Sequence, residues 1–275
     1  SFYQPDELIK DLGEKDRLLK EASKKSSLVI FPESSDFSKN LSGFLDPASA
    51  QKYFAGLAQG AVLIVDNNRI TEKEKLKSKT ILIDSREGIA GFYDKNLLTP
   101  GGEFIPYLVQ APFLIFERIA GNNLISSQAA FSKGQEKNVF NHRLAKIKIL
   151  VCSDIISPDL ARKNGKFDLM INLNNLAIFN GNPILEKQLL KMAKFRAAEN
   201  KKYLAISSNF GHSYIINPSG KTAAFTDSTG YQILTAEIVP NDIETWYNKS
   251  GDIPILTLSL FGILMSLKTA GSRKF

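Results

Sequence analysis

The feature that most constrains the fold is an apolar run that ends at the only cysteine of the 275-residue chain. Apolar residues recur at every second position of 146–151, which predicts a strand leading to Cys152. Ser157 suits a helix N-cap and Pro158 suits the first helical position, so a helix should open over residues 157–163. Since α/β sheets usually place their chemistry between a strand's carboxyl end and a helix, Cys152 is a candidate nucleophile. A buried structural cysteine is the alternative.

Similar patterns elsewhere predict a layered α/β architecture in one large domain. Helices with one apolar face are expected over residues 5–25 and 183–200. Residues 96–145 are irregular and rich in Phe, Gly and Asn, which is typical of a functional loop. Further strands are expected at 27–31, 61–66, 80–84, 88–93, 169–173, 204–208, 213–217 and 231–237, with a charged turn over 71–79 and a hairpin turn at 218–221.

Composition excludes some classes of protein. One cysteine excludes an internal disulfide, and two histidines without paired cysteines argue against a metal site, so no metal or cofactor is predicted. The net charge of +7 does not predict a nucleic-acid partner, because lysines alternate with acids, as in residues 72–75. The stretch 211–215 resembles a serine-hydrolase elbow but has Ile215 where that elbow needs a small residue.

The C-terminal end differs from the rest of the chain. Residues 253–267 form a 15-residue stretch without charge, preceded by Trp246 and followed by Lys268. Its length also suits a core or interfacial helix, but the flanks favour a last membrane helix. We therefore expect a domain over 1–250 on the outer side of a membrane and an apolar segment with a basic tail over 251–275. The start at Ser1 suggests a piece of a longer protein.

A nucleophilic thiol needs a base or a positively charged neighbour. Glu33 follows the first expected strand and Lys95 follows the segment 88–93, so both belong at strand ends. A carboxylate there could take the thiol proton, and a lysine could stabilise a thiolate and an oxyanion. Taken singly, Glu33 would be a helix-start acid and Lys95 a surface lysine.

These residues lie in motifs that resemble a known family. Residues 31–33, 93–106 and 151–154 resemble the Glu-Lys-Cys motifs of the nitrilase superfamily, the carbon-nitrogen hydrolases. The middle segment, of the form Y-x-K-x-x-L-x-P-x-G-E-x-x-P, is similar in detail to apolipoprotein N-acyltransferases. Further similarity to that family runs through residues 172–175, 195–200, 208–211 and 251–254.

The resemblance implies an αββα sandwich with Cys152 as nucleophile, Glu33 as general base and Lys95 as stabiliser of the tetrahedral intermediate. Glu103 would assist or orient Lys95. Apolar loops with Phe104, Phe113, Phe116 and Phe131 could form a lid. The residues expected to contact substrate are Ser153, Asp154, Phe104, Phe179 and Asn209.

The implied reaction is acyl transfer through a cysteine thioester, without a cofactor. The partners would be a phospholipid acyl donor, a diacylglyceryl-cysteine lipoprotein acceptor and the bacterial inner membrane, with the catalytic domain on the periplasmic side. Two departures put the acyl pocket and the acceptor in question: Ser153-Asp154 replaces the usual Tyr-Glu, and residues 175–180 differ from the family pattern. A soluble amidase and an inactive scaffold are the alternatives.

Overall fold

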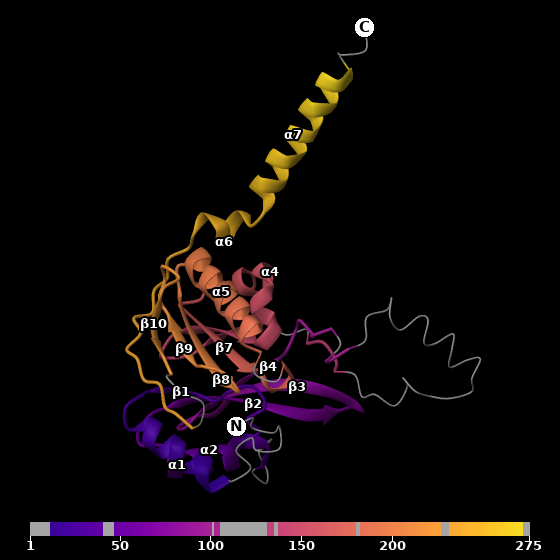
Figure 1. The fold of residues 1–275 in the computed structure, drawn as a ribbon. Coiled ribbons are helices and arrows are strands. Elements are labelled where there is room, and N and C mark those ends of the chain that lie inside the picture. The colour runs from indigo at the N-terminus through magenta and orange to yellow at the C-terminus, as the bar shows by residue number, and fades with distance from the viewer. Residues whose placement is uncertain are drawn as a thin grey trace, which may run out of the picture.

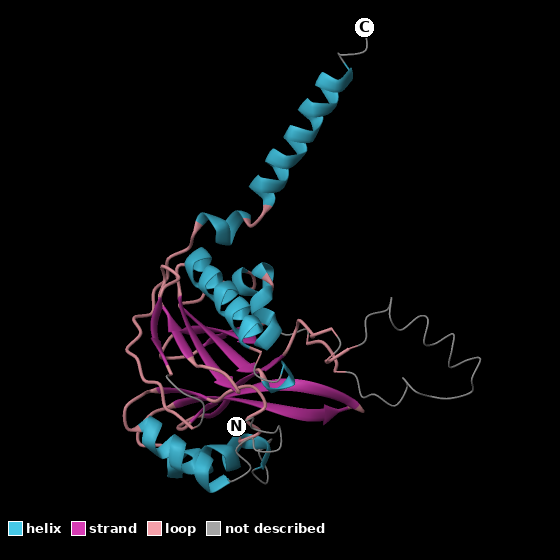
Figure 2. Ribbon diagram, in the orientation of Figure 1, coloured by secondary structure: helices cyan, strands magenta, loops and turns pink. Residues whose placement is uncertain are grey.

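The computed structural model describes residues 12–40, 47–100, 102–104, 131–134, 137–179, 182–226 and 231–271. Two sheets pack face to face and helices cover both outer sides (Figures 1 and 2). The strand orders are β1-β2-β3-β4 in the first sheet and β10-β9-β8-β7-β6-β5 in the second. This is the αββα sandwich predicted from the resemblance.

The first sheet carries α1 (Leu12–Ser23) and α2 (Pro47–Leu57) on its outer face. Short β1 (Leu28–Ile30) runs parallel to β2 (Leu63–Glu72). The long hairpin of β2 with β3 (Lys75–Asp84) is followed by antiparallel β4 (Gly88–Asp94).

The charged turn predicted over 71–79 is wrong, because most of these residues continue the β2–β3 ribbon. The turn itself is Lys73 and Glu74, both at positive φ. Across the ribbon, Lys77 Nζ lies 2.7 Å from Glu72 Oε2. Charged side chains are tolerated in this hairpin because they pair with one another at its surface.

The second sheet has a parallel centre and antiparallel edges. Its central strands are β6 (Lys146–Val151), β7 (Leu169–Asn175) and β8 (Tyr203–Asn209). The helices α4 (Pro158–Arg162) and α5 (Pro183–Asn200) cover its outer face, and Ser157 caps α4 as predicted. The edge strands are β5 (Val139–Asn141), β9 (Tyr214–Ile216) and β10 (Thr222–Phe225), and the short 3-10 helices are η2 (Ser38–Asn40), η3 (Cys152–Ile156) and η4 (Ala177–Phe179).

Three apolar layers hold the sandwich together. Between the sheets, Leu63 and Leu82 of the first pack with Ile149 and Ile171 of the second. Separate clusters lie beneath α1 and α2 and beneath α5. Because β6 and β7 are buried on both faces, they read as nearly continuous apolar runs in the sequence.

The strand predicted at 231–237 is wrong, because the structure has irregular backbone over these residues. Its side chains are mostly exposed, and Tyr231 is 51% accessible. A strand with a period of two is held in a sheet by burying one face, and this segment buries neither. Conversely, β5 and β10 were not expected.

The chain ends with α6 (Trp246–Ser250) and α7 (Ile253–Gly271), and α7 extends away from the sandwich (Figure 1). Large apolar side chains are exposed along α7, among them Ile255, Leu258 and Phe261. Within the residues whose structure is described, no helix meets the length and apolarity needed to cross a membrane.

Candidate active site

The candidate nucleophile occupies a strained turn at the carboxyl end of a buried parallel strand. Cys152 follows β6 and opens η3, and its φ is 47°, a left-handed value that is unusual for a residue with a side chain. The surrounding chain holds it there, since the residue is only 5% exposed. This is the strand-to-helix junction that the sequence predicted for the thiol.

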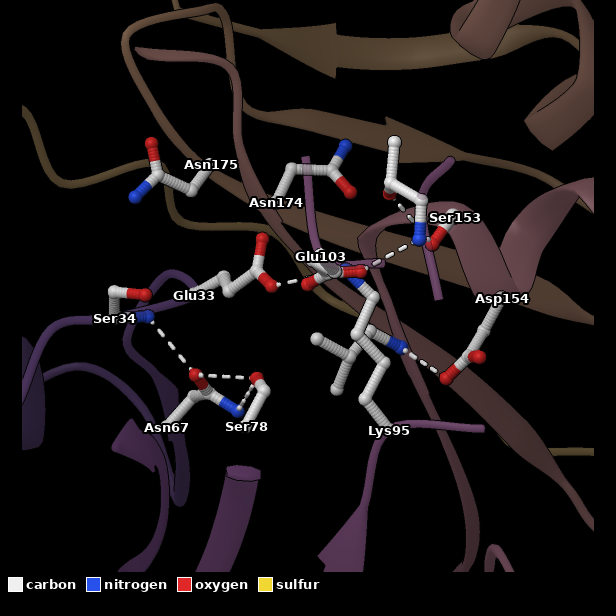
Figure 3. A network of polar contacts seen from close by, with 12 residues as sticks. Glu33, Ser34, Asn67, Ser78, Lys95, Glu103, Ser153, Asp154, Asn174 and Asn175 are labelled. Atoms are coloured by element: carbon white, nitrogen blue, oxygen red, sulfur yellow. Dashed lines mark hydrogen bonds and ion pairs between the residues drawn. The ribbon is translucent and has the colours of Figure 1, made fainter. Parts of the chain in front are cut away.

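Lys95 lies between two carboxylates. It directly follows β4 and is 2% exposed. Its Nζ is 2.8 Å from Glu103 Oε1 and 3.3 Å from Glu33 Oε1 (Figure 3). The structure therefore brings together three of the four predicted catalytic residues, which come from separate segments of the chain.

The charges of Glu33, Lys95 and Glu103 act on the pKa of the Cys152 thiol. Burial raises the pKa of the thiol to about 12, and Glu33 raises it as well, while the Lys95 ammonium and the Asn175 main-chain N–H favour the thiolate. At neutral pH the resting nucleophile is therefore a neutral thiol. It must lose its proton during attack, which requires a neighbouring base.

The pKa values of Glu33 and Lys95 are both raised. Burial is the largest influence on Glu33 and raises its pKa above the ordinary range, although the Lys95 charge opposes this. Burial also disfavours the Lys95 ammonium, but Glu33, Cys152 and Glu103 outweigh it and raise the pKa of Lys95. Glu33 is therefore a better proton acceptor than an exposed carboxylate, and Lys95 stays charged.

Asp154 joins the ends of the two strands that carry Lys95 and Cys152. One carboxylate oxygen accepts from the main-chain N–H groups of Leu97 (2.7 Å) and Asn96 (3.2 Å), next to Lys95. The other accepts from Val151 N (3.0 Å), next to Cys152, and from the Tyr93 hydroxyl (2.7 Å). The side chain is fully buried and its hydrogen bonds are to the protein itself. Asp154 is thus a structural bridge, and its role in substrate binding stays a prediction.

The loop that carries Glu33 is held from both sheets. Asn209, at the end of β8, donates from Nδ2 to the main-chain oxygen of Glu33 at 2.9 Å. From the first sheet, Asn67 Oδ1 accepts from Ser34 N at 2.9 Å (Figure 3). The predicted residue Asn209 therefore contacts the base, and Asn67 is an addition that sequence reasoning missed.

Of the other predicted substrate contacts, Ser153 and Phe104 lie near the catalytic candidates and Phe179 lies on the outer side of the second sheet. The Ser153 hydroxyl donates to the Leu97 main-chain oxygen, within the Asp154 bridge. Phe104 is half-buried directly after Glu103. Phe179 is half-buried and packs against the cluster beneath α5, on the outer side of the second sheet. Their role in substrate binding stays a prediction.

The predicted lid falls largely outside the described residues, which is where Phe113 and Phe116 lie. Phe131 is described, and its main-chain N–H donates to the main-chain oxygen of Glu103 at 3.0 Å. The guanidinium of Arg69 lies 5.9 Å from the Phe131 ring centre. Phe131 therefore packs close to the chain segment that holds the second carboxylate.

Several supporting residues were not predicted as site residues. Asn174 and Asn175 lie at the end of β7 and are drawn with the site residues in Figure 3, and the Asn175 main-chain N–H is hydrogen-bonded to Cys152. Thr99 N donates to Glu103 Oε2 at 2.7 Å and thereby orients that carboxylate. Gly134 N donates to Lys95 O at 2.8 Å, and a Cβ on this glycine would lie 2.1 Å from Asp94 O. The similarity of residues 172–175 to the family and the cluster of asparagines there were the sequence signals that could have revealed Asn174 and Asn175.

The two histidines form separate polar pairs. His142 Nε2 lies 2.7 Å from Asp84 Oδ2, and His212 Nδ1 lies 2.8 Å from Glu186 Oε1. In the part of the chain that the structure describes, no group of three or more His, Cys, Asp or Glu side chains is arranged to hold a metal ion.

Comparison with known proteins identifies the family and the fold. The family model for carbon-nitrogen hydrolases matches residues 9–248. The chain is therefore a member of the carbon-nitrogen hydrolase family, the nitrilase superfamily. Known structures share the fold: an amidase from Nesterenkonia sp., captured after acrylamide added to its active-site cysteine, superposes with a TM-score of 0.59 at 16% identity, covering 92% of this chain and 93% of the amidase. A carbon-nitrogen hydrolase from Helicobacter pylori gives a TM-score of 0.57 at 16% identity, covering 81% of each chain.

The curated relatives by sequence carry a narrower name. The chain is 29% identical over 184 residues to the apolipoprotein N-acyltransferase of Geobacter metallireducens, an alignment covering 66% of this chain and 34% of that protein. It is 25% identical over 296 residues to the apolipoprotein N-acyltransferase of Haemophilus influenzae, covering 99% of this chain and 52% of that protein. The chain thus spans between a third and about half of the length of these relatives.

Proposed function

We propose that this chain is the catalytic part of an N-acyltransferase that moves an acyl chain from a phospholipid to the N-terminal amine of a diacylglyceryl-cysteine lipoprotein. The observation that carries the proposal is the contact of Lys95 with both Glu33 and Glu103 beside the strained Cys152 turn. The names of the relatives by sequence supply the substrate class.

In the first step, Cys152 Sγ attacks the ester carbonyl carbon of the phospholipid while Glu33 takes the thiol proton. The Lys95 ammonium stabilises the negative charge on the carbonyl oxygen. When the tetrahedral intermediate collapses, the bond from the carbonyl carbon to the ester oxygen breaks. Glu33 returns the proton to the departing lysophospholipid, and the acyl chain remains on Cys152 as a thioester.

In the second step, the α-amino group of the lipoprotein attacks the thioester carbonyl. Glu33 accepts a proton from the amine, the carbon–sulfur bond breaks, and the thiolate regains that proton. An amide is formed and the enzyme returns to its resting state. Glu103 keeps Lys95 aimed at the reacting oxygen in both steps, because it makes the shorter of the two carboxylate contacts.

A membrane surface is the proposed site of action, at the periplasmic side of a bacterial inner membrane. The support is α7, whose apolar side chains Ile255, Leu258 and Phe261 face solvent. Burying such side chains in lipid releases roughly 25 cal/mol for each Å² removed from water. The apolar segment 251–275 would then attach the catalytic domain of residues 1–250 to the bilayer that supplies the acyl donor.

Intact-mass spectrometry after incubation with phosphatidylethanolamine vesicles tests the first step. The wild-type chain should gain the mass of one acyl group, which Cys152→Ala should lack, and hydroxylamine should release the group as expected of a thioester. An adduct of the same size on Cys152→Ala would remove this residue from the mechanism.

A diacylglyceryl-cysteine peptide added to the acylated chain tests the second step. The peptide should gain the acyl group and the enzyme should lose it. An amidase would instead release ammonia from small amides and leave the lipopeptide unchanged, and that outcome would reject acyl transfer. A thioester must be protected from water, whereas an amidase must admit it, so slow hydrolysis of the adduct without the peptide is also expected.

A further inference from the structure

The loop that carries Glu33 adopts a backbone that it would not favour alone. Ser34 has a φ of 59° and Asp36 has a φ of 50°, both left-handed values in residues with side chains. Such conformations persist only where surrounding contacts impose them. The contacts around residues 33–38 therefore determine where the Glu33 carboxylate points.

Asn67 of β2 contacts the residue that directly follows Glu33. This side chain is fully buried, and its Oδ1 accepts from Ser34 N at 2.9 Å. Its main-chain oxygen accepts from Asp36 N at 3.0 Å, so Asn67 holds both left-handed residues. One residue of the neighbouring strand thus fixes the turn that directly follows the base.

Asn67 also connects this turn to the strand that precedes Lys95. Its Nδ2 lies 3.1 Å from Ser78 Oγ and 3.0 Å from Thr80 Oγ1, both on β3. The main-chain oxygen of Ser78 in turn accepts from Lys95 N at 3.0 Å. Figure 3 shows Asn67 and Ser78 together beneath the Glu33 loop. A short chain of hydrogen bonds therefore runs from the turn after Glu33 to the backbone of Lys95.

We propose that Asn67 is a positioning residue that sets the distance and direction between the Glu33 carboxylate and the Lys95 ammonium. Its side chain hydrogen-bonds to Ser34, Ser78 and Thr80, so it acts on the base through the backbone of Ser34 and on the lysine through Ser78. This inference rests on the proposed function only in taking Glu33 as the base of Cys152.

The chain offers a matched control in the next residue. Asn68 is also fully buried, and its Nδ2 donates to Ser38 Oγ at 2.8 Å and Asp66 Oδ2 at 3.0 Å. Its Oδ1 accepts from Lys39 N at 2.9 Å. Asn68→Ala therefore removes a comparable set of buried hydrogen bonds from the far end of the same loop, without touching Ser34.

The readout is the rate at which iodoacetamide alkylates Cys152 between pH 5 and pH 10, with unfolding in urea measured in parallel. Cys152 is the only thiol in the chain, and the same reaction on Cys152→Ala gives the alkylation of other groups to be subtracted. The charged groups that face Glu33 are Lys95, Glu103 and Arg69, and Lys95 lowers the pKa of Glu33 by its charge and its hydrogen bond.

Asn67→Ala should slow alkylation at pH 7 about tenfold and move the acid limb of the profile to higher pH, because Glu33 loses its contact with Lys95. Asn68→Ala should lose stability but keep the wild-type profile. Identical profiles for the two folded variants, or a wild-type profile for Asn67→Ala, would overturn the proposal.

Should Asn67→Ala not fold, the double variant Ser78→Ala and Thr80→Val removes both hydroxyls that hold the Asn67 amide. It should shift the profile in the same direction, and an unchanged profile would again overturn the proposal. The alkylation assay needs no lipid, so a wild-type chain that forms no acyl adduct would reject acyl transfer while leaving this inference to be decided by the profiles.

Discussion

Two of the buried lysines, Lys95 and Lys148, have opposite surroundings. Lys95 lies between the carboxylates of Glu33 and Glu103, whereas Lys148 on β6 donates to the main-chain oxygens of Leu160 and Lys163 and lies 4.4 Å from the Phe167 ring centre. The pKa of Lys95 is raised by its partners in spite of burial, and burial alone lowers the pKa of Lys148 to about 7. The comparison teaches that the partners of a buried amine decide whether it stays charged. The candidate site has a permanent cation because it supplies two anions to hold it.

The largest expected effect comes from removing the paired lysine. Lys95→Met should lower the rate of acyl-adduct formation by roughly 10³-fold, because the oxyanion loses its cation in a buried site. Lys148→Met should stay within about threefold of wild type. Intact-mass time courses with phospholipid vesicles measure both rates. Equal losses in the two variants would show that burial, and not pairing, is what matters.

Replacing the candidate base Glu33 should lower the rate of acyl-adduct formation nearly as much. Glu33→Gln keeps the shape of the side chain but cannot accept a proton, so adduct formation should fall by roughly 10²- to 10³-fold. Because the pKa of Glu33 is raised in the folded wild type, the wild-type rate should decline as the pH falls through that raised value. The variant should lose this dependence. If the rate of Glu33→Gln still declines at low pH as the wild-type rate does, the decline belongs to another titrating group.

Weakening the Asp154 bridge between the ends of β4 and β6 should lower the stability of the protein by an intermediate amount. Asp154→Asn replaces one acceptor oxygen of a fully buried carboxylate that receives donors from Tyr93, Asn96, Leu97 and Val151. An amide cannot accept all of these bonds, so the free energy of unfolding should fall by about 2–4 kcal/mol. Urea unfolding at pH 7 measures the loss. Asp159→Asn is a suitable control, because that carboxylate pairs with Arg162 and Lys163 at the surface. A loss no larger than that of the control would contradict the bridging role.

The smallest expected effect is a gain in the free energy of unfolding. Lys148→Met should increase the free energy of unfolding at pH 6–7 by on the order of 2 kcal/mol, because the buried amine gains no carboxylate partner and methionine has no charge to desolvate. The unfolded chain binds a proton between pH 7 and about 10.5 that the folded chain has released, so wild-type stability should rise with pH across this window. The advantage of the variant should therefore shrink toward pH 10. Urea unfolding at pH 6.5 and pH 9.5 tests the sign, and a destabilised variant at both values would mean that the bonds to the two carbonyls outweigh the cost of burial.

The sequence by itself determined the layered architecture and the place of three catalytic candidates at strand ends, whereas Glu103 came from the family resemblance alone. The buried parallel strands appear as apolar runs because both of their faces are covered, and α4 begins at Ser157 and Pro158 because capping is a local property. Glu33, Lys95 and Cys152 follow strands that could be recognised in this way. Their shared position at strand ends was therefore readable before any coordinates.

Only the tertiary structure decided which polar groups meet. Lys95 stands between Asp94 and Asn96, and Lys148 stands between Ile147 and Ile149. Neither neighbourhood shows the partners that decide the charge of the amine, which lie 8 to 62 residues away along the chain. Asp154 and Asn67 were not recognisable as supports, because their hydrogen bonds join segments that are 57 and 33 residues apart. The segment 231–237 has the apolar pattern of a strand, but pairing requires a buried face that this fold does not give it. Local pattern fixes local conformation, while burial and pairing depend on what the rest of the chain brings alongside.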